Sequence, residues 1–227
     1  MTSVRILGFA TLLSLAAFSF GQDKIKIEPK WGADLKIKVA MKGDIEIGGM
    51  SAKLDSKLSW SAKPGDDGST VTVHHDELSI KVMDQDVPVP FNDFVVSFDK
   101  AGMLTKLDGG IEGSDPLRWF LSTSFYAPAK EVTKDEVVKW EVAANDKLGI
   151  GARTIETTYL GDAMVGKTKA FKFKQVTKET KTDFGTSGTL YVTADGHVLK
   201  AEISFKGLPI PQGGGDAEGK FTLSPIE

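Results

Sequence analysis

The chain of 227 residues contains no cysteine. This absence excludes disulfide bonds, and it also excludes a lipid-modified cysteine after a leader, as bacterial lipoproteins carry. Histidine is rare, with three residues in the whole chain, and no serine stands in a Gly-x-Ser-x-Gly nucleophile motif. Stability must therefore come from a buried core, for which the chain is long enough. Nothing in these absences favours an enzyme.

Long apolar runs are missing except at the beginning of the chain. Arg5 is the only charged residue there, and it precedes the almost wholly apolar run ILGFATLLSLAAFSF. The run is short for a membrane span, and Ser19 and Gly21 have the spacing of a cleavage site before Gln22. We interpret residues 1–21 as a signal peptide, with an uncleaved anchor as the alternative. The mature protein is then predicted to be periplasmic or secreted, without a transmembrane segment.

An excess of positive charge is also missing. Lysine and arginine number 28 in the chain, so loss of Arg5 with the leader leaves 27 basic against 31 acidic residues. The resulting net charge is −4, and the lysines are interleaved with acidic and apolar residues rather than gathered in a stripe. We therefore predict that nucleic acid is not a partner.

The chain is rich in strict alternation of apolar and polar residues. In residues 33–43 and 50–63 the residues that share one face are apolar: Leu35, Ile37, Val39 and Met41, then Met50, Ala52, Leu54, Leu58 and Trp60. A period of two is typical of a half-buried antiparallel strand. The same pattern continues to the end of the chain. We predict a mainly β fold, with 22–227 as a single β-rich domain. An arrangement of two similar halves, 22–113 and 132–227, stays open as an alternative.

The phase of the alternation changes at His-His-Asp-Glu, residues 74–77. Val71 and Val73 are odd-numbered, whereas the apolar residues from Leu78 onward are even-numbered, so we predict a bulge. The same four residues are the densest group of possible metal ligands. An extended strand puts only two of them on each face, fewer than a catalytic zinc uses, and His197 is distant in sequence. We predict no metal and no cofactor; a metal-dependent hydrolase is the less favoured alternative.

One segment, residues 115–127, has helical spacing. Ser114 or Asp115 can cap it, Pro116 fits its first turn, and Pro128 ends it. Its aromatic residues surround much of the circumference, more than one buried stripe requires. Farther on, the Gly- and Pro-rich residues 207–219 have no period and predict a loop.

Two hairpins have the form Gly-x-apolar-x-Lys after an aspartate, one within residues 94–107 and the other within 189–205. Asp and Gly suit hairpin turns, so the shared form follows from turn geometry and leaves a duplication open.

Residues 159–205 of the C-terminal half contain a recurring set of glycines and aromatic residues, Gly161, Gly166, Phe171, Phe173, Gly188, Tyr191 and Gly196, followed by Leu199 and Lys200. With these residues the segment resembles exported bacterial proteins of the LolA/LppX-like lipoprotein-carrier type. The resemblance implies a curved antiparallel sheet, a half-barrel or open barrel, whose concave side is covered by helix and can hold acyl chains. This chain has one good helix where the carriers generally have more.

These observations favour an exported, non-enzymatic binding protein that carries a lipid or another apolar ligand between the sheet and the helix. The predicted ligand-binding residues are aromatic: Trp119, Phe120, Phe125, Phe171, Phe173 and Phe205. The alternative is a structural or interaction module of the cell envelope that binds an envelope protein and no small molecule.

Overall fold

A computed structural model describes residues 24–30, 36–66, 68–88, 91–99, 104–111, 115–210 and 215–226. Within these residues the chain forms one 12-stranded antiparallel sheet, which is open, and a single α-helix. The predicted mainly β fold is therefore confirmed. The described residues contain no helix with the length and apolar character that a membrane crossing requires. The predicted signal peptide lies outside the described residues.

The elements follow one another as two groups of six strands with the helix between them. The first group is β1 (Lys36–Ile47), β2 (Met50–Gly65), β3 (Gly68–Val82), β4 (Gln85–Val87), β5 (Phe91–Asp99) and β6 (Leu104–Ile111). After α1 (Pro116–Thr123) come β7 (Val137–Val142), the 3₁₀ turn η1 (Asp146–Leu148), β8 (Arg153–Val165), β9 (Thr168–Glu179), β10 (Gly185–Val192), β11 (Val198–Pro209) and β12 (Asp216–Pro225).

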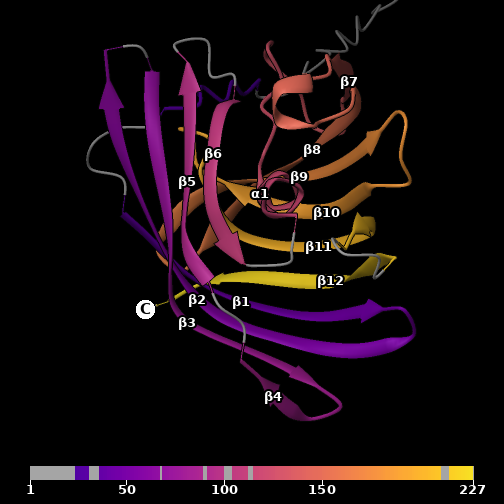
Figure 1. Cartoon of the computed structure of the whole chain (residues 1–227). Helices are drawn as coiled ribbons and strands as arrows, with labels where there is room; N and C mark the ends of the chain where they lie inside the picture. Colours follow the sequence, from indigo (N-terminus) through magenta and orange to yellow (C-terminus); the bar gives the residue numbers. More distant parts are fainter. Residues whose placement is uncertain are drawn as a thin grey trace, which may run out of the picture.

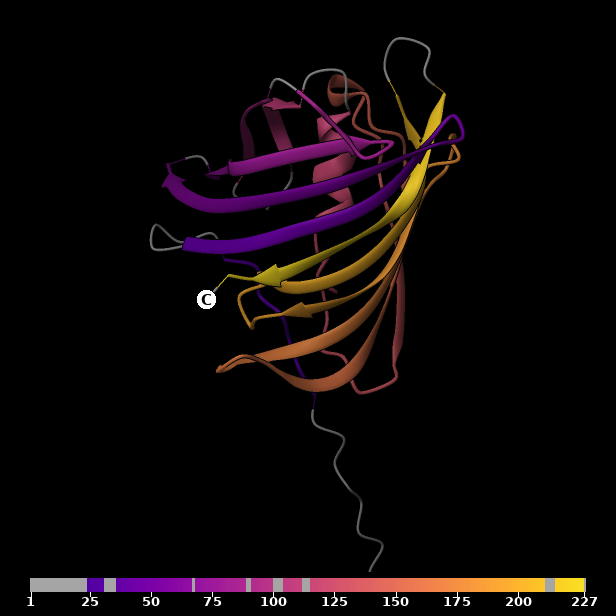
Figure 2. The same cartoon turned by 90° about the horizontal axis from the view of Figure 1, so that it is seen from below.

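The two groups join through the first and last strands. The spatial order is β6-β5-β3-β2-β1-β12-β11-β10-β9-β8-β7, with β4 added beside β3. The sheet bends around α1, which lies on its inner side (Figures 1 and 2). The predicted curved sheet with one covering helix is thus confirmed, and β6 and β7 form its two ends.

Alternation decides which face of each strand is buried. Val39 and Met41 in β1 and Leu54 and Leu58 in β2 are almost fully buried, whereas the lysines between them are exposed. The prediction for Met50 is wrong. Its side chain is 48% exposed, because it begins β2 directly after the turn from β1, beyond the cover of the core. Leu35 lies outside the described residues.

The predicted bulge in residues 74–77 is confirmed. Lys57 pairs with Glu77 and the next residue, Leu58, pairs with His75, so Asp76 is the extra residue of β3. The inserted residue changes the parity of the inward side chains from odd-numbered, as at Val73, to even-numbered, as at Leu78.

The helix begins as predicted and ends four residues early. The Asp115 side chain accepts a hydrogen bond from the Arg118 N–H at 3.0 Å, which caps the first turn. At the other end Ser124 is extended, and its hydroxyl donates to the Phe120 carbonyl at 2.8 Å. Hydroxyl groups compete with backbone donors for such carbonyls. The prediction of helix for residues 124–127 is therefore wrong.

The prediction of a loop over residues 207–219 is also wrong for residues 207–209 and 216–219, which lie in strands, whereas residues 211–214 lie outside the described residues. β11 continues to Pro209 and β12 begins at Asp216, and Leu208 pairs with Ala217. The glycines here allow close packing of backbones. A Cβ on Gly219 would lie 2.3 Å from the Asp44 carbonyl oxygen of β1, so the small residue serves strand pairing rather than a flexible connection.

Candidate functional site

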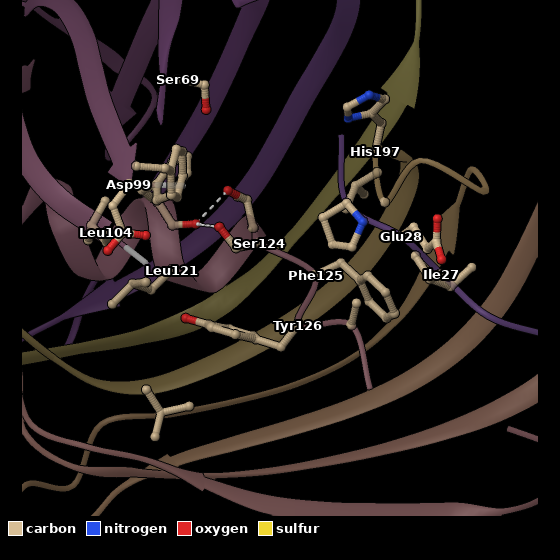
Figure 3. Close-up of a pocket in the computed structure, with 18 of the residues that line it drawn as sticks. Ile27, Glu28, Ser69, Asp99, Leu104, Leu121, Ser124, Phe125, Tyr126 and His197 are labelled. Carbon is tan, nitrogen blue, oxygen red and sulfur yellow. Dashed lines mark hydrogen bonds between the residues drawn. The ribbon is translucent and has the colours of Figure 1, made fainter. Parts of the chain in front are cut away.

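A cavity of about 830 Å³ lies between the inner face of the sheet, the chain that follows α1, and the N-terminal segment. Its volume is within the range of small-molecule sites, about 300–1,000 Å³. Most of the lining is apolar: Ile27, Ile37, Trp60, Phe98, Leu104, Phe120, Leu121, Phe125, Trp140, Val142, Ile150 and Val198. Figure 3 shows Ile27, Phe125 and His197 on one side of the cavity and Asp99, Leu104 and Leu121 on the other.

The segment after α1 is held in place by one side chain of β9. Gln175 accepts a hydrogen bond from the Tyr126 N–H at 2.9 Å and donates to the Ser124 carbonyl at 3.0 Å. A single amide therefore satisfies backbone groups of the extended segment as a neighbouring strand would. This contact places Phe125 and Tyr126 in the wall of the cavity.

The N-terminal segment, residues 24–30, forms another wall. Ile25 bridges to Val132, and the N–H of Glu28 donates to the Ala194 carbonyl at 3.1 Å. Ile27 is buried by these contacts and lines the cavity.

Two of the six predicted ligand-binding residues, Phe120 and Phe125, line this cavity. The other four lie outside the described lining. The Trp119 ring packs against Phe205 at 5.3 Å between centroids, and Phe173 packs against Phe125 at 4.8 Å. Phe171 lies 6.2 Å from the ring of Tyr159. Phe173 and Phe205 belong to the buried core, and the partly buried Trp119 and Phe171 pack against it.

The position of α1 inside the curved sheet explains its many aromatic residues. Phe120 faces the rings of Phe94, Phe98 and Trp60 from the first group of strands, whereas Trp119 faces β11 and β12. A helix enclosed on several sides buries more than one stripe.

A buried ion-pair cluster fastens α1 to β9. The Arg118 guanidinium donates to both carboxylate oxygens of Glu179, at 2.9 and 2.7 Å, and to Asp115 at 2.5 Å. The Gly151 N–H donates to Glu179 at 2.8 Å. Burial alone raises the pKa of Glu179, but the hydrogen bonds from Arg118 and Gly151 and the charges of Arg118 and Arg153 outweigh it, so the pKa lies below its usual value.

A second buried cation, Arg153, lines the cavity itself. The residue is 6% exposed, and its Nη1 donates to the Tyr126 hydroxyl at 3.0 Å. Burial raises the pKa of the Tyr126 phenol, although the nearby Arg153 charge opposes that shift. Among the described residues, neither Arg153 Nε nor Trp60 Nε1 has a hydrogen-bond partner.

Arg153 and Glu179 were not predicted from the sequence, although a signal for them was present. Arg153 has the same parity as the buried Ile155, and Glu179 has the same parity as the buried Phe173. Charged residues in the inward phase of a strand are seldom buried without a partner. Such residues therefore mark a polar site on an otherwise apolar face.

The histidines of β3 point to opposite faces. His75 is buried and its Nδ1 lies 2.9 Å from the Ser56 hydroxyl, whereas His74 is exposed and pairs with Asp93. The described residues include no group of three or more His, Asp or Glu side chains arranged to hold a metal ion.

No family model matches the chain, and no curated protein matches it. Among solved structures, it is similar to a DUF1329 family protein from Desulfovibrio piger. The two share 10% identity, and the match covers 85% of this chain and 87% of that chain with a TM-score of 0.21.

Proposed function

We propose that this protein is an exported, non-enzymatic binding protein that holds an apolar chain, such as the acyl chain of a lipid, in the cavity beside α1. The single observation that carries the proposal is a cavity of about 830 Å³ with a mainly apolar lining inside a curved sheet. The apolar leader of residues 1–21 supports export. The weaker alternative, an envelope module without a small molecule, gives no reason for so large an apolar space beside α1.

The energetics of the lining suit a ligand of moderate affinity. Transfer of a Leu-sized apolar group from water into such a site contributes about 1.5–3 kcal/mol, and micromolar affinity needs about 8 kcal/mol after the cost of association. A chain that contacts several of the large apolar residues of the lining meets this requirement.

The test uses protein purified without detergent. Native mass spectrometry is expected to show a co-purified mass or, after delipidation, uptake of one fluorescent fatty acid per chain. Ala127→Trp fills part of the cavity, because Ala127 is half-buried in its lining, and uptake is expected to fall at least about tenfold.

The matched control is Ala163→Trp. Ala163 is also half-buried but lies near the end of β8, outside the cavity lining. Uptake by this variant is expected to equal that of the unaltered protein. A protein that takes up no fatty acid, or two variants with equal uptake, would contradict the proposal.

A further inference from the structure

At one wall of the cavity, a buried hydrogen-bond donor has no acceptor among the described residues. Arg153 is nine-tenths buried, lines the cavity, and has a guanidinium Nε that no acceptor of the described residues reaches. A buried donor without an acceptor is costly, and a buried cation is usually paired with an anion. The unpaired Nε of Arg153 is therefore consistent with a ligand that supplies the acceptor.

The nearest buried carboxylate is already engaged. Glu179 pairs with Arg153 across β8 and β9, but it accepts two hydrogen bonds from Arg118 and one from Gly151. Within the described part of the chain no carboxylate forms an ion pair with Arg153, whereas Arg118 forms ion pairs with both Glu179 and Asp115. Among the described residues, Arg153 therefore has no carboxylate in direct contact, although its charge acts on the neighbouring Glu179.

Tyr126 adds a second donor at the same place. Its hydroxyl accepts the hydrogen bond from Arg153 Nη1, so its own proton remains for another acceptor. Tyr126 also lines the cavity. Two donors, one of them charged, thus lie together at a wall of a mainly apolar space.

Two further buried polar side chains lie on the same face of the sheet as Arg153. Thr177 on β9 is the diagonal neighbour of Arg153, and Thr157 follows on β8. The hydroxyls of both threonines are buried without a partner among the described residues. Unsatisfied polar groups are rare in protein cores, so each of them requires an explanation. Neither threonine lines the cavity, so the ligand contacts are assigned to Arg153 and Tyr126, which do.

We infer that the ligand is amphipathic and anionic, and that its carboxylate or phosphate headgroup binds to Arg153 and Tyr126 while its chain occupies the apolar part of the cavity. This inference rests on the proposed function and specifies the class of ligand. Arginine suits the role because its planar guanidinium donates to such oxygens in parallel pairs. The other charged residues that line the cavity are Lys26, Glu28 and Asp99, and the first two form an exposed ion pair with each other.

The experiment compares three probes with the same chain: dodecanoate, dodecyl phosphate and 1-dodecanol. Their affinities for the full-length delipidated protein are measured by isothermal titration calorimetry. The unaltered protein is expected to bind at least one of the two anions at least about tenfold more tightly than the alcohol, since a hydrogen bond to a charged group contributes that much. The anion that binds more tightly identifies the headgroup.

Arg153→Met is expected to remove the preference for anions and to leave the affinity for 1-dodecanol within about twofold. Arg153→Lys keeps the positive charge and is expected to keep part of the preference for anions. This variant therefore separates the effect of the charge from a general failure to fold. Lys26→Met removes a lining cation that already has a partner in Glu28, and is expected to keep the whole preference.

Equal affinity of the unaltered protein for all three probes would overturn this inference and leave the proposed function intact. Binding of none of them would contradict the proposed function. Loss of the preference in Lys26→Met but not in Arg153→Met would also overturn the inference, because the headgroup would then lie at Lys26.

Discussion

At the scale of single residues, the three histidines lie in different electrostatic surroundings. A hydrogen bond and the charge of Asp93 raise the pKa of exposed His74 above its usual value. Burial lowers the pKa of His75, and the neighbouring His74 lowers it further. Burial also lowers the pKa of His197, against the opposing charge of Asp195. The two adjacent imidazoles therefore differ in protonation near neutral pH.

A pH titration followed by NMR of the imidazole C–H groups tests this difference. His74 is expected to titrate above about 6.5, the usual pKa of histidine, and His75 and His197 below it. A lowered pKa in the folded state means that the unfolded chain binds protons more readily, so the contribution of His75 to stability is complete above about pH 6.5 and is lost as the pH falls through its folded pKa. His74→Asn assigns the signals. If the three histidines showed the same pKa, the described burial of His75 would be wrong.

At the scale of elements, the sequence predicted the start of α1 well and its end poorly. The start depends on local signals, Asp115 and Pro116, which are readable in the sequence. The end depends on Gln175, which is distant in sequence and replaces helical hydrogen bonds of the extended segment. Likewise, the glycines of residues 207–219 favour a loop by composition, whereas close packing against β1 explains Gly219. Contacts between distant segments decide both cases.

The ion pair between Arg118 of α1 and Glu179 of β9 is expected to stabilise the fold. Arg118→Met leaves the Glu179 carboxylate, whose side chain is 2% exposed, without its main partner. The free energy of unfolding is expected to fall by about 3 kcal/mol, because the buried carboxylate loses its ion-pair partner and keeps only the Gly151 N–H donor and the neighbouring Arg153 charge. Urea unfolding followed by circular dichroism measures it.

The matched control is Lys57→Met. Lys57 lies 2.7 Å from Glu77, the same separation as in the Arg118–Glu179 pair, but both side chains are largely exposed. Exposed pairs contribute little to stability because water screens them. Equal losses in the two variants would show that Glu179 is not buried as described.

At the scale of the whole molecule, alternation predicted the sheet and its buried face, but not the position of the cavity. The four predicted residues outside the lining, Trp119, Phe171, Phe173 and Phe205, pack against other rings, as large aromatic side chains do. The cavity instead lies between the two ends of the open sheet. Leu104 of β6 and Trp140 of β7 both line it.

One contact spans these two ends. The Asn145 side chain, between β7 and β8, donates to the Leu104 carbonyl of β6 at 3.3 Å. The order in which the strands join decides which residues meet there, and periodicity carries no information about that order. The position of Arg153 in the lining follows from the same strand order. The sequence indicates that Arg153 points inward, because it has the same parity as Ile155. It does not indicate that Arg153 lies beside Tyr126 in the cavity lining.

Photo-crosslinking with an alkyl diazirine carboxylate distinguishes a ligand in the cavity beside α1 from one on the outer surface, because it locates the bound chain. After irradiation and proteolysis, mass spectrometry is expected to find the label on the cavity lining, in residues 120–129 and in β7, and unlabelled dodecanoate is expected to suppress it. Labelling confined to exposed outward residues such as Lys174 and Glu202, or labelling that dodecanoate does not reduce, would contradict the account.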